Sequence, residues 1–138
     1  MMKVFADTGF WYALANEDDG LHQIAKQLHE DWKSKIIVTT DEILSEFLGR
    51  LSAPNHRPIA LALLEVIRKN SKVEVREQSR TSFNNGLEIY RNRKDKSCSL
   101  VDCVSFSVMK EENIYQALAH DHDYEQEGFT ALMRVQLQ

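Results

Sequence analysis

The feature that most constrains the fold is a short apolar run, Val4-Phe5-Ala6, that ends at once in Asp7 and Thr8. An apolar run of this length between polar residues predicts a buried strand. The residues that follow, as far as Ala15, have the apolar spacing of a helix, which Asp7 or Thr8 can cap. Because ligands of open parallel α/β sheets bind outside the carboxyl ends of the strands, Asp7 is the first candidate site residue.

Strand-like and helix-like segments alternate along the rest of the chain. The sequence predicts strands at 4–6, 36–38, 72–75, 116–119 and 129–137. It predicts helices at 8–15, 22–32, 39–51, 58–68, 79–90 and 100–111. This alternation predicts an α/β fold, a three-layer α/β/α arrangement around a central parallel sheet with right-handed crossovers. The length of 138 residues predicts a single domain that spans 1–138.

Composition excludes several classes of protein. The net charge of −4 excludes attraction of nucleic acid by an overall positive potential, so a polyanion must meet a local basic patch or metal ions. No segment approaches the roughly 18–20 apolar residues that cross a membrane, and Asp7 cuts the first apolar run before it reaches the length of a signal-peptide core. Cys98 and Cys103, five apart, would face different directions on a helix and stay free thiols. We therefore expect a cytoplasmic protein.

Two glutamates lie in the predicted helix after the second strand. Thr39-x-x-Glu42 fits a capping box, so Glu42 is assigned a structural role. Glu46 has no such explanation and lies between apolar residues, which makes it a second candidate site residue. The alternative is an ordinary solvated surface residue.

The remaining candidates lie near the last long helix and after the next strand. Ser99-x-x-Asp102 also fits a capping box, but the apolar residues around Asp102 would fix this acid rigidly. The stretch 120–123 alternates His and Asp after an apolar run, which leaves open a polar turn, an Asx-type cap or a functional role for Asp121 and Asp123. A zinc site lacks a cysteine or an HExxH spacing to complete it.

Carboxylates gathered at one sheet edge repel one another unless cations are present. Oxygen ligands without thiolates or a histidine set suit Mg²⁺ or Mn²⁺. Such an ion also allows an acidic site to accept a phosphate polyanion.

These segments resemble the motifs of the PIN-domain nucleases, and among them the VapC-type toxins of bacterial toxin–antitoxin pairs. The resemblance covers almost the whole chain. It is carried by Val4-Phe5-Ala6-Asp7-Thr8, by Asp19 with His22, by Thr39-Thr40-Asp41-Glu42-Ile43-Leu44-Ser45-Glu46, by residues 99–111 around Asp102, and by residues 117–129 around Asp121. The stretch 99–111 is the most specific of these.

The resemblance implies a metal-dependent endoribonuclease, a homodimer, and a cognate antitoxin whose C-terminal segment occupies the active site. The implied catalytic and metal-binding acids are Asp7, Glu46, Asp102 and Asp121. His or Asp often stands in the family at the position of Asp123, so Asp123 is expected to share or supplement the role of Asp121.

Our hypothesis is that these acids hold one or two Mg²⁺ or Mn²⁺ ions that position an RNA phosphodiester and activate a water for in-line attack. Thr8 and Ser99 would orient the carboxylates from behind. The products should carry 5′-phosphate and 3′-hydroxyl ends, and 2′,3′-cyclic phosphates would contradict this mechanism.

Basic and aromatic residues suggest two further roles. The run that contains Arg91, Arg93, Lys94 and Lys96 either touches the RNA backbone or is a solvated loop. Three aromatic residues either stack on bases or belong to the core or a dimer interface; these are Trp11, Tyr12 and Trp32.

Three rival classes are weighed against the nuclease. A phosphoacceptor receiver domain needs paired acids after the first strand, where only Asp7 stands, and an Asp where Arg76 follows Val75. A haloacid-dehalogenase-like phosphatase needs Asp-x-Asp, and Asp7-Thr8-Gly9 lacks the second acid. A non-catalytic PIN module that only binds RNA or protein is the main alternative, and the presence of all the acids argues against it.

Overall fold

The computed structural model describes residues 2–135 of the chain. Its parallel sheet has five strands in the order β3-β2-β1-β4-β5. The strands are β1 (Lys3–Ala6), β2 (Ile36–Thr40), β3 (Val73–Arg76), β4 (Gln116–Leu118) and β5 (Thr130–Ala131). Every neighbouring pair is parallel.

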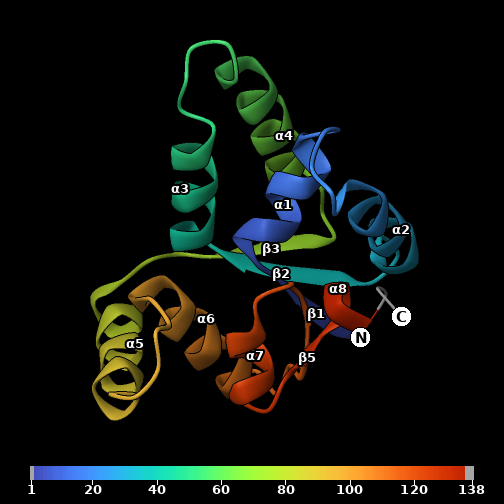
Figure 1. The fold of residues 1–138 in the computed structure, drawn as a ribbon. Coiled ribbons are helices and arrows are strands. Elements are labelled where there is room, and N and C mark those ends of the chain that lie inside the picture. Colours follow the sequence, from blue (N-terminus) through green and yellow to red (C-terminus); the bar gives the residue numbers. More distant parts are fainter. Residues whose placement is uncertain (1, 136–138) are drawn as a thin grey trace.

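Helices cover both faces of this sheet. They are α1 (Thr8–Ala15), α2 (His22–Trp32), α3 (Asp41–Arg50), α4 (Arg57–Lys69), α5 (Arg80–Asn92), α6 (Leu100–Glu111), α7 (His122–Gln126) and α8 (Leu132–Val135). In Figure 1 the helices α1, α3 and α4 lie above the sheet, and α5, α6 and α7 lie below it. The predicted three-layer α/β/α architecture is confirmed.

The two central strands are buried on both faces. Val4, Phe5 and Ala6 of β1 are fully buried, as are Ala117 and Leu118 of β4. Strands covered on both faces carry continuous apolar runs instead of an alternating pattern. This burial explains why the sequence showed them as unbroken apolar segments.

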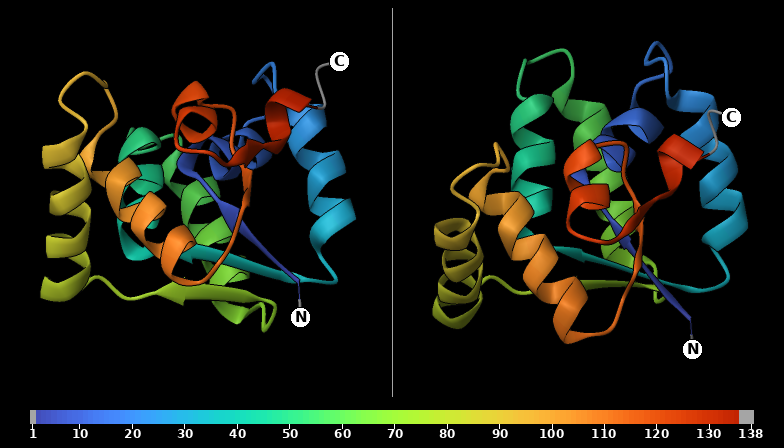
Figure 2. Two further views of the ribbon diagram at one scale, coloured as in Figure 1. Left: turned by 90° about the horizontal axis from the view of Figure 1, so that it is seen from below. Right: turned by 60° about the horizontal axis from the view of Figure 1, so that its bottom comes forward.

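The strand order places the carboxyl ends of β2, β1 and β4 side by side. From β1 the chain proceeds to β2 and β3 on one side, and it then crosses to β4 and β5 on the other. Ligands of α/β proteins bind where the strand order reverses in this way. In Figure 2 the beginning of α1, the connection from α5 to α6, and α7 all lie at the end toward which β1 runs from the N-terminus.

The C-terminal region corrects one prediction. Instead of a strand over 129–137, β5 covers only Thr130–Ala131 and the short helix α8 follows; positions 136–137 lie outside the described residues. The consecutive residues Ala131, Leu132 and Met133 are all buried. A half-buried strand would instead bury every second residue. Gly128 breaks the chain before β5 as predicted, with a φ of 95° that glycine adopts without strain.

Two local predictions near helix starts are also wrong. The N-cap of α3 is Thr40, whose hydroxyl accepts from Ile43 N–H at 3.1 Å. Thr39 still belongs to β2, and its hydroxyl donates to the Ala6 carbonyl at 3.0 Å, so the Thr39–Glu42 capping box does not form. Residues 122–126, for which no helix is predicted, form α7.

The two cysteines are free thiols as expected, but they do not face different directions. Cys98 precedes α6, so the spacing of five residues is not helical throughout. The Sγ atoms of Cys98 and Cys103 lie 3.9 Å apart, and both thiols are buried and free. Within residues 2–135, none of the helices is both long and apolar enough to cross a bilayer.

Candidate metal centre

Asp7 lies at the junction of β1 and α1, where it occupies the N-cap position of α1. Its side chain makes no hydrogen bond to the helix backbone, so the carboxylate is available for another role. The Asp7 N–H donates to the Leu118 carbonyl at 3.1 Å, which ties the end of β1 to the end of β4. Only 8% of Asp7 is exposed. This acid therefore lies almost out of water at the central edge of the sheet.

The first turn of α6 holds Asp102. The Ser99 hydroxyl accepts from the Asp102 N–H at 3.1 Å, and the Asp102 Oδ2 accepts from the Ser99 N–H at 3.1 Å, so the predicted capping box is present. Cys98 and Cys103 occupy the two positions of a hydrophobic staple around this box. Because the box uses only one carboxylate oxygen, the other is left for a ligand.

Asp121 and Asp123 bring further carboxylates from the end of β4. Asp121 is the N-cap of α7, and its Oδ1 accepts from the Asp123 N–H at 2.9 Å. Asp102, Asp121 and Asp123 each offer a carboxylate oxygen, and these atoms all lie within 4.8 Å of one another. The three acids are therefore candidates to share one divalent cation.

Glu46 reaches the same region from α3. It is exposed, and its carboxylate accepts a hydrogen bond from the Thr8 hydroxyl. Thr8 is only 2% exposed at the start of α1. This contact fixes the direction of a glutamate that would otherwise be free to move on the surface.

A pocket of about 390 Å³ joins these groups. It is lined by Asp7, Thr8, Gly9, Tyr12, Asp19, Leu21, Glu46, Arg50, Ser99, Asp102, His120 and Asp121. The structure thus brings together the four acids that the sequence predicted. Asp123 is not among the lining residues but is grouped with Asp102 and Asp121, while Glu42 is in neither set.

The acids in this pocket penalise one another's charge. Burial, together with the negative charge of Asp102, raises the pKa of Asp7 from 3.8 to about 7. Burial also raises the pKa of Asp102 from 3.8 to about 6, to which the charge of Asp121 contributes. A divalent cation held by these carboxylates would relieve both the loss of water and the repulsion.

The residues present fit Mg²⁺ or Mn²⁺. The cluster offers carboxylate oxygens only, which hard divalent cations prefer. The neighbouring His122 imidazole instead lies 3.0 Å from the Glu125 carboxylate. No histidine or thiol belongs to the three-acid group formed within residues 2–135, so its donor set does not favour zinc.

Asp19 and His22, which belong to one motif of the family resemblance, have different contacts in the structure. Asp19 lines the acidic pocket, and its Oδ1 accepts from the Leu21 N–H at 2.8 Å. The Nδ1 atom of His22 lies 2.7 Å from the Ala13 carbonyl oxygen, and His22 does not line the pocket. His22 therefore joins α2 to α1, while Asp19 adds another negative charge to the pocket.

The tryptophans belong to the core and not to a base-stacking surface. Trp11 is 2% exposed and Trp32 is 9% exposed. The indole N–H of Trp11 donates to the Thr39 hydroxyl at 3.3 Å. Of the three aromatic residues considered from the sequence, only Tyr12 lines the acidic pocket.

Sequence reasoning missed two residues at the centre. The guanidinium of Arg50 lies 4.3 Å from the ring centroid of Tyr12, at the mouth of the acidic pocket. Arg50 follows Glu46 by four residues and so lies on the same helix face, which could have indicated that it faces the pocket. Tyr124 is fully buried behind the acids, and its charged neighbours Asp7 and Asp102 add to the rise in its pKa that burial causes.

Comparisons with known proteins agree with this geometry. The chain matches the PIN domain over residues 4–129. The 23S rRNA-specific endonuclease VapC20 of Mycobacterium tuberculosis is 33% identical in an alignment of 129 residues that covers 91% of this chain and 95% of VapC20.

Solved structures show the same likeness. The crystal structure of Mycobacterium tuberculosis VapC20, a sarcin-ricin loop cleaving toxin, matches with a TM-score of 0.82 and 30% identity over 93% of this chain and 97% of that one. VapBC2 from Rickettsia felis, bound to a DNA fragment from their promoter, matches with a TM-score of 0.67 over 94% of this chain and 96% of that one; at 14% identity it supports the fold alone. The chain thus belongs to the PIN-domain family, among its VapC-type toxins.

Proposed function

We propose that this protein is a Mg²⁺- or Mn²⁺-dependent endoribonuclease. Asp7, Glu46, Asp102 and Asp121 would hold the ion, with Asp123 as a further ligand. The observation that carries the proposal is the set of three carboxylate oxygens within 4.8 Å of one another, beside a buried Asp7 whose pKa is raised to about 7. Acids placed at such cost to the fold mark a functional site.

Each residue has a distinct part in this proposal. Asp102 is immobilised by the Ser99 capping box, and Glu46 is directed by the Thr8 hydroxyl. Ser99 and Thr8 therefore act as positioning residues. A divalent ion held by these acids would supply positive charge for the phosphodiester and for activation of the attacking water. Attack by water predicts 5′-phosphate and 3′-hydroxyl ends.

The proposed biological setting follows the relatives. VapC20 is named as specific for 23S rRNA and as cleaving the sarcin-ricin loop, so ribosomal RNA is the first substrate to test. An antitoxin protein that blocks the acidic pocket, a homodimer, a single domain over 1–138 and a cytoplasmic location complete the proposal.

The test is cleavage of purified ribosomes and of total RNA in Mg²⁺, in Mn²⁺ and in EDTA. We expect a few discrete cuts that require the metal, are lost in Asp7→Asn and Asp102→Asn, and leave 5′-phosphates. Glu42→Gln is a matched control for Glu46→Gln, because both residues lie on α3 and only Glu46 lines the pocket. Cuts that persist in EDTA, or cyclic phosphate ends, would contradict the proposal.

A binding module without catalysis is the second candidate. It predicts RNA or protein binding that survives Asp102→Asn and no cleavage by the wild-type protein with either metal. The clustering of carboxylates around the buried Asp7 argues against it, because carboxylates without a cation weaken binding of a polyanion.

A further inference from the structure

The connection from α5 to α6 forms a second, basic site beside the acidic pocket. We propose that this basic loop, defined as residues 90–98, binds one unpaired nucleotide of the RNA strand that flanks the cleaved phosphodiester, with the base against Tyr90 and phosphates against Lys94 and Lys96. The inference rests on the proposed function and names how that site takes its substrate.

The cations of the basic loop are not all engaged within the protein. Arg93 pairs with Glu127 and, at 3.0 Å, Lys110 pairs with the same carboxylate. The Glu127 side chain is only 6% exposed, so Arg93 anchors the loop to the segment after α7. Arg93 is therefore a structural residue and not a phosphate ligand.

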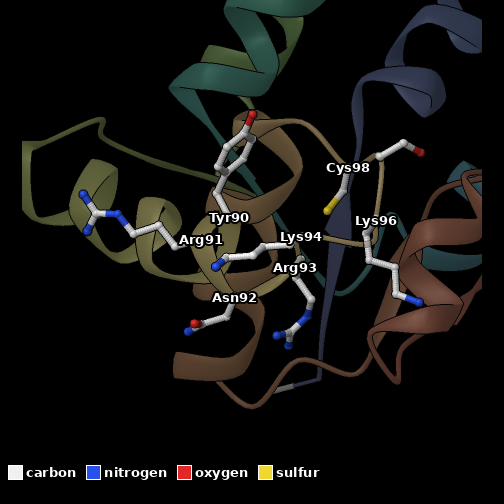
Figure 3. Close-up of a pocket in the computed structure, with 8 residues that line it drawn as sticks. Tyr90, Arg91, Asn92, Arg93, Lys94, Lys96 and Cys98 are labelled. Atoms are coloured by element: carbon white, nitrogen blue, oxygen red, sulfur yellow. The ribbon is translucent and has the colours of Figure 1, made fainter.

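Three other cations remain for a ligand. Among residues 2–135, Arg91 and Lys94 form no ion pair, and Lys96 meets only the exposed carboxylate of Asp95 at 3.8 Å. Exposed ion pairs at such distances contribute little. Figure 3 shows Arg91 and Lys96 pointing to opposite sides of the loop, with Lys96 extending toward α7.

A cavity of about 630 Å³ lies among these side chains. This volume is within the range of small-ligand sites and is large enough for a nucleotide. Tyr90 lines it with 51% of its surface exposed. An accessible aromatic ring among lysines and arginines is the combination that binds single-stranded RNA, by stacking on a base and pairing with phosphates.

The basic loop leads directly into the metal centre. Cys98 ends the cavity lining and immediately precedes Ser99, the N-cap of α6 that holds Asp102. In Figure 3 Lys96 extends toward α7, the helix that begins after Asp121. An RNA strand whose cleaved phosphodiester lies at the acidic pocket would therefore continue across the basic loop.

Charge balance favours RNA as the occupant. The protein carries a net charge of −4, and the acidic pocket contains five carboxylates. A polyanion approaches such a site only along local cations. An acidic peptide would use the lysines but would leave Tyr90 and the cavity without a matching group.

Binding of single-stranded RNA tests the charges without depending on cleavage. The probe is a labelled oligouridylate of about twelve nucleotides, a length that spans a single binding groove. Lys94→Gln/Lys96→Gln should weaken binding about tenfold and lower the slope of log K against log salt by about 1.4, since each single-strand phosphate contact contributes about 0.7. The matched control is Lys26→Gln/Lys69→Gln, which removes equal charge from exposed positions on α2 and α4.

Stacking is tested at Tyr90. Tyr90→Phe keeps the ring and should bind like the wild type, whereas Tyr90→Leu should bind about tenfold more weakly. Equal loss in both variants would show that the hydroxyl matters and would overturn the stacking assignment. Thermal unfolding of each variant confirms that the exposed substitution leaves the fold intact.

Cleavage kinetics separate this inference from the proposed function. If wild type cleaves, the loop variants should raise KM about tenfold and leave kcat within about twofold. Loop variants that bind and cleave like the control pair overturn the inference alone, as does a loss confined to kcat. Normal RNA binding with lost inhibition by the antitoxin would make the loop a protein-docking surface. No cleavage by the wild type contradicts the nuclease, while the oligouridylate assay still decides the RNA-binding claim.

Discussion

The Thr8 hydroxyl donates to the Glu46 carboxylate and thereby joins the first residue of α1 to the middle of α3. The bond is part-buried, and it connects two elements that follow different strands. It therefore sets the position of Glu46, an exposed acid on a helix that could otherwise move freely.

Loss of this bond should weaken metal binding without unfolding the protein. Thr8→Val preserves the shape of a side chain that is 2% exposed, but it cannot donate to Glu46. We expect Mn²⁺ affinity to fall at least tenfold, as for other groups that orient metal ligands. Calorimetric titration measures this, and Thr8→Ser, which keeps the hydroxyl, is the control. Wild-type affinity in Thr8→Val would show that the Thr8 hydroxyl does not position a metal ligand.

The raised pKa of Asp7 makes the metal-free protein less stable as the pH increases. The folded carboxyl has a pKa of about 7, against 3.8 for its ordinary value, so the folded state holds a proton that the unfolded state has lost. The free energy of unfolding should therefore fall between about pH 4 and pH 7.

Removal of the Asp7 charge should restore the stability that the metal-free protein loses at higher pH. At about pH 8, Asp7→Asn should raise the free energy of unfolding of the metal-free protein by an amount on the order of 2 kcal/mol. Urea unfolding in EDTA at two pH values measures it. Added Mn²⁺ should stabilise the wild type more than the variant, and a variant less stable than the wild type at that pH would contradict the assignment.

We expect the Tyr124 hydroxyl to contribute to metal binding and not to the stability of the fold. Its hydroxyl has no hydrogen-bond partner among residues 2–135, yet Asp7 is close enough for each group to shift the pKa of the other. Its ring packs edge-to-face on Phe106 at 5.0 Å between centroids. Tyr124→Phe should therefore leave stability unchanged or raise it by about 1 kcal/mol, while Mn²⁺ affinity falls several-fold.

Calorimetry and urea unfolding on the same preparations separate these two effects. Tyr115→Phe, at an exposed position, is the control for loss of a hydroxyl. If Tyr124→Phe destabilises the metal-free protein and binds Mn²⁺ normally, the hydroxyl has a structural role instead.

Gly86 permits the close packing of α5 on α6. A Cβ at this position would lie 2.6 Å from Val104 Cγ2 and 3.1 Å from Val104 N. Gly86→Ala should therefore destabilise the protein by about 1–3 kcal/mol through overpacking, despite the gain of about 1 kcal/mol in helix propensity. Gly49→Ala is the control, because an added Cβ there meets nothing within 4 Å. Equal stability of both variants would contradict the tight contact.

The sequence predicted most of the fold because the central strands are buried on both faces. Continuous apolar runs such as Val4-Phe5-Ala6 are typical of such strands, and Asp7 directly follows the first of them. The Ser99–Asp102 capping box was also predictable, because its hydrogen bonds are local. Asp7 and Asp102 could therefore be assigned to one edge before their distances were known.

Other features depend on contacts that a linear pattern does not contain. Thr39 and Thr40 are both able to cap, and only the extra length of β2 makes Thr40 the N-cap. The segment after β5 turns into α8 because Leu132 and Met133 must both be buried. Arg50 reaches the acidic pocket by stacking on Tyr12, a contact between helices from distant parts of the sequence.

The strand order also governs when activity can arise during synthesis. A chain made only as far as α6 already contains Asp7, Glu46 and Asp102, but it lacks β4, which pairs with β1. Without β4 the Asp7 N–H has no partner at Leu118, and Asp121 is missing from the acid cluster. A chain still in synthesis therefore has no complete acid cluster until β4 has joined β1 and Asp121 has been added.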